Sequence, residues 1–288
     1  MINLLLYIVL VNGVQSTIEK NLTNHPSDDR YASYSPDGSQ ILFESNRSGD
    51  WDLYVMNTDG TMVRQITRDS SEDRRPSWHP NGDEILFESN RSGKFQLYTA
   101  NLFNDKVKAI QIPVAKTEPI FAHYSPDGFS IAYSEKFQGD SSRLVIIDLL
   151  GKVKVELADY GFRSFYPRWS PDSKKILFFS RHETGNQDDE IYTINIDGTG
   201  KKRLTNWPKH NFCPSWSPNG MQIAYAQSME GSRPEIHIMQ ADGSNAKRIT
   251  FNDDGDTLPN WSPDGTKLLV TAYRNGNYEI VEMLIPSR

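Results

Sequence analysis

One short aromatic motif occurs six times in this chain and constrains its fold more than any other feature. Each copy is an aromatic residue followed by Ser or His, Pro, Asp or Asn, and Gly or Ser, and the copies start at Tyr34, Trp78, Tyr124, Trp169, Trp216 and Trp261. Successive starts lie 44, 46, 45, 47 and 45 residues apart. A period of this length is typical of β-propeller blades. Because each unit packs on its neighbours, we expect a single closed domain over residues 17–288.

Four strand patterns recur within each repeat, and the first repeat illustrates them. Residues 30–34 lead into Ser-Pro-Asp-Gly at 35–38, which has the residue preferences of a type I turn. Apolar segments follow at 41–45 and 52–56, and an Asp-Gly turn precedes a fourth segment at 63–67. No ten-residue segment has a sustained helical period. The sequence therefore predicts an all-β, six-bladed propeller with four antiparallel strands per blade.

The two ends of the chain predict how the ring closes. The last repeat reaches its third strand at 279–284 and shows no fourth. Residues 18–23 end in Leu-Thr and resemble the fourth-strand sequences Lys-Arg-Leu-Thr from Lys202 and Lys-Arg-Ile-Thr from Lys247. We therefore expect the N-terminal strand to complete the last blade, which leaves no open sheet edge there.

The first residues resemble a targeting segment rather than a part of the propeller. Residues 1–16 contain an apolar run at 4–11, too short to span a bilayer, followed by small residues. This pattern predicts a secretory signal peptide, a mature chain without a transmembrane segment, and a periplasmic or secreted location.

Charge and cysteine content exclude several classes of function. The formal net charge is −6, and Lys and Arg are interleaved with acids, so we expect no nucleic-acid partner. The single cysteine, Cys213, excludes an internal disulfide framework and a cysteine-based metal cluster. It lies beside Pro214 in a predicted strand, where a buried apolar thiol is expected. We expect the protein to be a monomer.

The order of the repeat motifs resembles a known family. Each unit carries P-x-W-S-P-D-G or a variant of it, then I-x-[FY], S-N-R-S-G, [DE]-[IL]-Y, D-G and R-[IL]-T. This series resembles the WD40-like, or PD40, repeats of the TolB propeller over nearly all of the mature chain. The resemblance implies the propeller fold. Related propellers serve as periplasmic adaptors, as gating domains of proteases and as oligogalacturonate lyases, so fold alone does not give the function.

The repeated motif itself is predicted to be structural. Asp37, Asp127 and Asp264 of the turns are expected to accept hydrogen bonds from their own backbone two residues on. The six aromatic residues offer a sugar-stacking surface as an alternative, but their constant place at a strand end favours wedges between blades.

The candidate site is the mouth of the central channel, where one blade crosses into the next. Five and four residues before each aromatic stand Asp29-Arg30, Asp73-Arg74, Pro119-Ile120, Ser164-Phe165, Asn211-Phe212 and Asp256-Thr257. Acids and amides converging there are suited to a divalent cation or ligand amines, and the arginines to carboxylates. The alternative is that each Asp only caps the crossing turn. We expect Asp29, Arg30, Asp73, Arg74, Ser164, Asn211, Asp256 and His210 to bind a ligand or partner.

Catalytic chemistry finds little support in the sequence. His25 and His210 fall in crossing loops and approach the predicted mouth, as metal-binding histidines do in oligogalacturonate lyases, but no residue-by-residue match exists. No G-x-S-x-G elbow is present at a strand-to-helix turn. We therefore predict no catalytic residues and no cofactor, with a divalent cation in the channel as the alternative.

Two irregular loops form a second candidate surface. Residues 136–142 in the third repeat and 181–189 in the fourth replace the short turn of the other repeats. We expect both on one face, opposite the crossings, where loops on a rigid scaffold carry binding functions.

Together these features favour an exported, non-enzymatic propeller that binds protein partners of the cell envelope, as the TolB resemblance implies. The alternative is a carbohydrate-active propeller, sugar-binding or lyase-like, with its site at the channel mouth.

Overall fold

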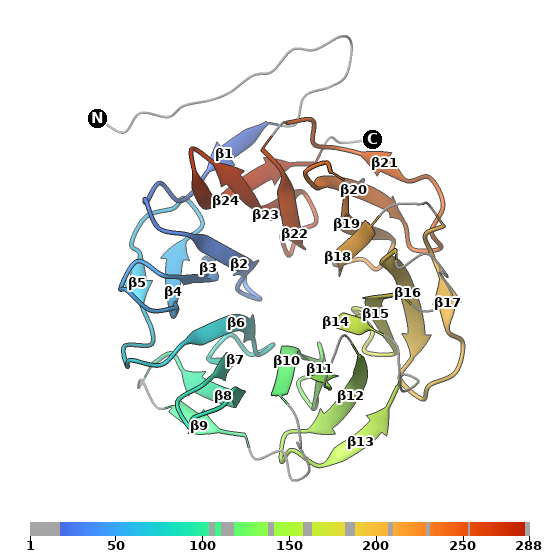
Figure 1. Ribbon diagram of the computed structural model, residues 1–288, viewed down its shortest axis with the longest axis horizontal. Coiled ribbons are helices and arrows are strands. Elements are labelled where there is room, and N and C mark those ends of the chain that lie inside the picture. The colour runs from blue at the N-terminus through green and yellow to red at the C-terminus, as the bar shows by residue number, and fades with distance from the viewer. Residues whose placement is uncertain are drawn as a thin grey trace.

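A computed structural model describes residues 18–103, 107–110, 118–137, 141–157, 163–181, 188–206, 210–228, 231–252 and 254–285. Within these ranges the chain forms six four-stranded antiparallel sheets around a central axis (Figure 1). The predicted six-bladed, all-β propeller is confirmed. The predicted signal peptide, residues 1–16, lies outside the described residues. In the described part of the chain, no helix is long and apolar enough to cross a membrane.

Each blade runs from an innermost strand at the channel to an outermost strand at the rim. The innermost strands are β2 (Asp29–Tyr34), β6 (Asp73–Trp78), β10 (Glu118–Tyr124), β14 (Ser164–Trp169), β18 (His210–Trp216) and β22 (Asp256–Trp261). The second strands are β3 (Gln40–Ser45), β7 (Glu84–Ser89), β11 (Ser130–Lys136), β15 (Lys175–Ser180), β19 (Gln222–Ser228) and β23 (Lys267–Arg274). The third are β4 (Asp52–Asn57), β8 (Gln96–Asn101), β12 (Ser142–Asp148), β16 (Glu190–Asn195), β20 (Glu235–Gln240) and β24 (Asn277–Leu284). The outermost are β5 (Arg64–Gln65), β9 (Val107–Ala109), β13 (Val153–Glu156), β17 (Lys202–Arg203), β21 (Lys247–Arg248) and β1 (Glu19–Asn21).

The hydrophobic core lies between blades. One cluster joins Leu42, Leu53 and Val55 of the first blade to Ile85 and Phe87 of the second. The second and third strands read as nearly continuous apolar runs because both of their faces are covered by neighbouring blades.

The repeated aromatic residues act as wedges between blades. Trp78, Trp169 and Trp261 each donate from Nε1 to a backbone carbonyl of the preceding blade, at 3.2, 3.1 and 3.2 Å. The hydroxyls of Tyr34 and Tyr124 donate to carboxylates of the preceding blade, each at 2.7 Å. These five rings are buried, so they do not form a sugar-stacking surface. Burial and a hydrogen bond for the polar edge are what an interior Trp or Tyr requires.

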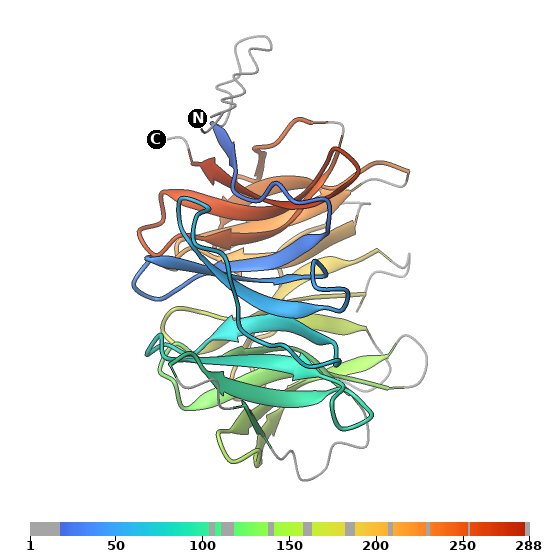
Figure 2. The same ribbon diagram turned by 90° about the vertical axis from the view of Figure 1, so that its left-hand side faces the viewer.

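The two ends of the chain meet in one blade, as predicted. β1 pairs antiparallel with β24, Glu19 opposite Met283, and the amide of Leu22 donates to the carbonyl of Ile280 at 2.8 Å. Figure 2 shows the first strand and the last strand side by side at the same blade. The N-terminal strand therefore closes the ring.

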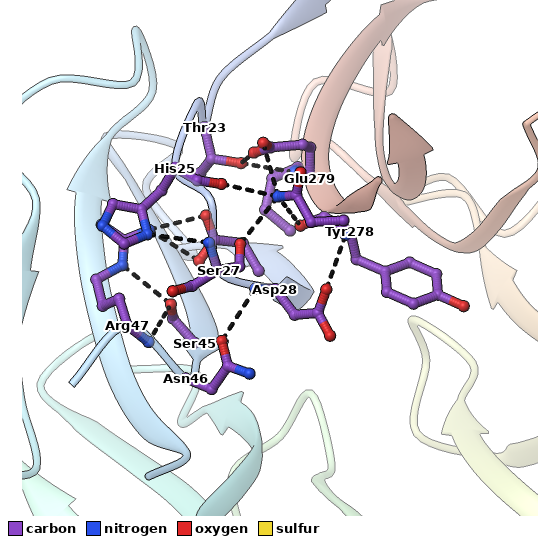
Figure 3. A network of polar contacts seen from close by, with 12 residues as sticks. Thr23, His25, Ser27, Asp28, Ser45, Asn46, Arg47, Tyr278 and Glu279 are labelled. Atoms are coloured by element: carbon purple, nitrogen blue, oxygen red, sulfur yellow. Dashed lines mark hydrogen bonds and ion pairs between the residues drawn. The ribbon is translucent and has the colours of Figure 1, made fainter. Parts of the chain in front are cut away.

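The threonine that ends the recurring R-[IL]-T motif, and Thr23 at the corresponding position of Asn-Leu-Thr, binds the third strand of its blade. Thr23 accepts a hydrogen bond from the amide of Ile280 at 2.8 Å and donates to the carboxylate of Glu279 at 2.5 Å (Figure 3). The equivalent threonines of the first, fourth and fifth blades repeat this pattern, with the acids Asp52, Glu190 and Glu235. An acid at or near the start of the third strand thus accepts a hydrogen bond from the threonine of the fourth-strand segment, and this contact attaches the short outer strand to its blade.

The prediction that the two irregular loops lie opposite the crossings is wrong. Lys136 pairs with Glu118, and Ser180 pairs with Ser164, so both loops leave their strands at the crossings end of the channel and not opposite it. The reason is that an antiparallel hairpin returns its second strand to the end at which its first strand begins. Residues 138–140 and 182–187 of these loops lie outside the described residues.

A paired substitution tests the closure. We expect Thr23→Val to lower the free energy of unfolding by about 2–3 kcal/mol, because it removes the hydroxyl that binds one oxygen of the buried Glu279 carboxylate and the amide of Ile280. Thr67→Val, the same change within the first blade, is the matched control and should cost a similar amount. Urea unfolding measures both, and a Thr23→Val protein as stable as wild type would contradict closure by the N-terminal strand.

Candidate functional site

The acids of the predicted mouth are buried ion-pair partners. Asp29, Asp73 and Asp256 begin their innermost strands, and each is 0% exposed. Each carboxylate binds the guanidinium that follows the second strand of its own blade, in the pairs Asp29–Arg47 at 2.8 Å, Asp73–Arg91 at 2.9 Å and Asp256–Arg274 at 2.8 Å. Burial raises the pKa of Asp73 and of Asp256, and the guanidinium opposes that rise. Each Asp–Arg pair therefore links the start of the innermost strand to the end of the second strand of the same blade.

The polar residues at the same position in the fourth and fifth blades are also held by hydrogen bonds, within a blade and to the preceding blade. Ser164 is within 3.2 Å of the Ser180 hydroxyl and donates its amide to Ser142 at 2.8 Å. Asn211 donates to Glu190 at 3.0 Å and accepts from Gln227 at 2.8 Å. Within the described residues, no group of three or more His, Cys, Asp or Glu side chains is placed to hold a metal ion.

Arg30 and Arg74, in contrast, lie at the surface of the mouth in a stack with two aromatic rings. Both guanidiniums lie over the ring of Trp51, at 5.0 and 5.2 Å from its centroid, and Arg30 also lies 4.2 Å from the centroid of Tyr278. Their side chains are 32% and 28% exposed and pair with Asp28 and Glu72. This mouth stack, Tyr278–Arg30–Trp51–Arg74, spans the sixth, first and second blades.

The two histidines of the crossing loops have local partners. His210 Nδ1 lies 3.5 Å from the carboxylate of Asp189, and its side chain is 36% exposed. His25 Nδ1 accepts the amide of Ser27 at 3.2 Å, beside the amide of Tyr278, which donates to Asp28 at 2.9 Å (Figure 3). Each histidine orders a crossing loop at the mouth.

A ring of residues around the channel was not predicted from the sequence. The third residue of each innermost strand pattern has a left-handed backbone, with φ between 49° and 63°, and sits at a shift in strand register; these residues are Tyr31, Arg75, Phe121, Tyr166, Cys213 and Leu258. Bulky residues rarely adopt this conformation, which costs about 1–3 kcal/mol each. Six such residues at one level form the channel ring.

Side chains of the preceding blade hold the bulges in place. The amide of Arg75 donates to Glu44 at 2.6 Å, and the amide of Phe121 donates to Glu88 at 2.5 Å. The guanidinium of Arg75 also pairs with Glu88. Burial raises the pKa of Glu88 to about 7, against the opposing effect of Arg75. The strained backbone thus joins successive blades through hydrogen bonds.

Aromatic side chains of the channel ring pack on one another. Phe121 makes a tilted ring contact with Tyr31 and a T-shaped contact with Tyr166, at centroid distances of 6.4 and 5.4 Å. One sequence signal marks these positions: a proline follows Arg75, Tyr166, Cys213 and Leu258. Proline inside a strand pattern indicates an edge strand or a bulge, and the innermost strands are both.

Comparison with known proteins identifies the family of this chain. The TolB beta propeller domain matches residues 9–119 and 111–288. The chain belongs to this family. The PD40 resemblance is therefore confirmed, and this TolB-type propeller can be compared with solved structures.

Solved structures share the fold at low sequence identity. A protein described as TolB from Agrobacterium tumefaciens is 22% identical, with a TM-score of 0.74 over 96% of this chain and 100% of that one. TolB from Acinetobacter baumannii is 20% identical, with a TM-score of 0.65, and the match covers 91% of this chain and 64% of that one. Oligogalacturonate lyase from Vibrio parahaemolyticus is 13% identical, with a TM-score of 0.70 and 96% of each chain covered. At these identities the likeness shows the TolB-type fold alone.

Substitutions of two neighbouring residues at the mouth should distinguish a buried structural residue from a surface residue. Asp29→Ala should lower the free energy of unfolding by about 3–5 kcal/mol, because Arg47 is left without its buried partner. Arg30→Ala is the matched control next in sequence and should cost about 1 kcal/mol or less, as its ion pair is solvated. Denaturant unfolding provides the measurement, and equal effects of the two changes would contradict this assignment.

Proposed function

We propose that this chain is an exported, non-enzymatic propeller that binds a protein of the cell envelope at its channel mouth. The observation that carries the proposal is the mouth stack, in which two arginines and two aromatic rings lie partly exposed across three blades. Export rests on the apolar run at residues 4–11.

The residue types of the mouth stack favour a protein partner. Trp, Tyr and Arg are the residues that contribute most binding energy at protein interfaces. The rings hold the two guanidiniums in position, so little side-chain entropy is lost on binding. Asp28 and Glu72 balance the charge of the arginines, and the surface therefore suits a partner that offers both apolar groups and acceptors.

The acids of the mouth are poorly placed for catalysis. The carboxylates of Asp29, Asp73 and Asp256 are buried against guanidiniums, and a residue of the channel ring follows each acid two positions along the same strand. A general acid or base must reach a bound substrate, so this arrangement favours surface recognition over an acid–base reaction.

Co-purification tests the proposal. Tagged wild-type protein and Trp51→Ala are incubated with an envelope extract of the encoding organism, and the captured protein is identified and its Kd measured. Trp51→Ala should weaken binding by about 30-fold or more, the effect of losing a central hot spot of about 2 kcal/mol.

Arg64→Ala on the exposed outer strand β5 is the control and should bind like wild type. Unchanged capture by Trp51→Ala, with the control also unchanged, would place the partner elsewhere and contradict the proposal.

A second candidate function, carbohydrate binding, is favoured by one observation away from the mouth. Trp216 is the copy of the repeated aromatic whose indole N–H finds no partner among the described residues, and it is only partly buried. Its ring lines a groove of about 490 Å³ between the fourth and fifth blades, with Asp172, Lys175, Thr193, Lys202, Asn219 and Asp242. This volume is in the range of small-molecule sites. An aromatic face with hydroxyl, amide and balanced charged groups suits a neutral oligosaccharide.

Calorimetry with neutral oligosaccharides tests the groove. Trp216→Ala should abolish binding that wild type shows, whereas Trp51→Ala should leave it intact. A protein that binds none of a panel of neutral oligosaccharides, or whose Trp216→Ala variant binds as well as wild type, would exclude the groove as a sugar site.

A further inference from the structure

A small cavity lies inside the channel, beside the channel ring. Its volume is about 20 Å³, and side chains from five blades line it, among them Ser33, Arg75, His123, Arg168 and Asn260. A cavity needs about 10–15 Å³ to hold one water molecule, so this one accommodates a single small species.

Arg168 brings a positive charge into this cavity without an acid beside it. One terminal nitrogen donates to the carbonyl of Pro167 at 3.0 Å, and the guanidinium lies 3.5 Å from the ring centroid of Tyr166. No ion pair joins Arg168 to a described acid, and its Nε is buried without a hydrogen-bond partner. The other arginine of the cavity, Arg75, pairs with Glu88 but also leaves its Nε without a partner.

The ionisable groups around Arg168 are neutral at physiological pH. Burial raises the pKa of Tyr166 and of Tyr31 above the ordinary tyrosine value, and raises the pKa of the Cys213 thiol to about 12. Burial and the charge of Arg168 hold the pKa of His123 well below its usual value. None of these groups supplies a negative charge to Arg168.

The remaining polar groups of the cavity can also donate. The hydroxyl of Ser33 is buried without a partner, and the amide of Asn260 lines the same space. Two guanidiniums, a hydroxyl and an amide therefore belong to the side chains that line a volume of about one water molecule. Arg168 is partly buried and has no ion-pair partner among the described residues, and an anion in this position would offset the cost of desolvating its charge.

We propose that this cavity binds a monovalent anion of about the size of a water molecule, with chloride as the abundant example, between Arg75 and Arg168. The anion accepts hydrogen bonds from side chains of the first, second, fourth and sixth blades. It therefore acts as a structural ion at the centre of the ring, independent of any partner at the mouth.

Thermal unfolding in matched salts tests the proposal. The protein is transferred to sodium methanesulfonate, which is too large for the cavity, and chloride is titrated in at constant ionic strength. Bound chloride stabilises the folded state by mass action, so the Tm of wild type should rise by several degrees and then saturate. Arg168→Met should lose this response, whereas the surface variant Arg64→Gln should keep it.

Arg168→Met also keeps the test decisive, because removing a partly buried charge that has no ion-pair partner should leave the protein at least as stable as wild type in chloride-free buffer. Crystals soaked in sodium bromide provide a direct readout, with an anomalous peak expected between Arg75 and Arg168. A wild-type Tm that is the same in chloride and methanesulfonate, or bromide-soaked crystals without a peak at this position, would overturn the proposal.

Discussion

The pairing of β1 with β24 is the interaction on which the rest of this molecule depends. A propeller blade buries its apolar faces only against its neighbours, so a ring with one incomplete blade would expose a sheet edge and the side of an adjacent core. The strand that completes the sixth blade comes from the opposite end of the chain, and Thr23 just after it binds the buried acid Glu279 of β24. Closure is thus a long-range contact built from the same threonine–acid motif as in the first, fourth and fifth blades.

Closing six twisted sheets around one axis forces their innermost strands together, and the channel ring is the result. Each innermost strand has a bulge with a left-handed residue, which turns side chains such as Tyr31, Phe121 and Tyr166 toward the axis. Acceptors on the preceding blade, Glu44 and Glu88 among them, hold these bulges. The strained backbone therefore lies where neighbouring blades already constrain it most.

A nearly sixfold scaffold carries chemistry only where its repeats differ. The Asp–Arg pairs of the mouth repeat in three blades, whereas the mouth stack, the Trp216 groove and the Arg168 cavity each occur once among the described residues. We propose a different class of partner for each of the three: a protein, a neutral sugar and a small anion. On these proposals, recognition depends on departures from the repeat and not on the motif that builds the blades.

The blade number, the four-strand order, the turn at each Ser-Pro-Asp-Gly and the closing strand could all be predicted from sequence patterns, because those features depend on local turn chemistry and on a fixed repeat length. It located the mouth residues along the chain but not their orientation. Asp29, Asp73 and Asp256 turn into their blades, and Trp51, from another loop, joins Arg30 and Arg74 at the surface. These orientations depend on three-dimensional packing, because a bulge changes which face a strand residue occupies, and because the stack and the cavity combine residues from blades that are distant in sequence.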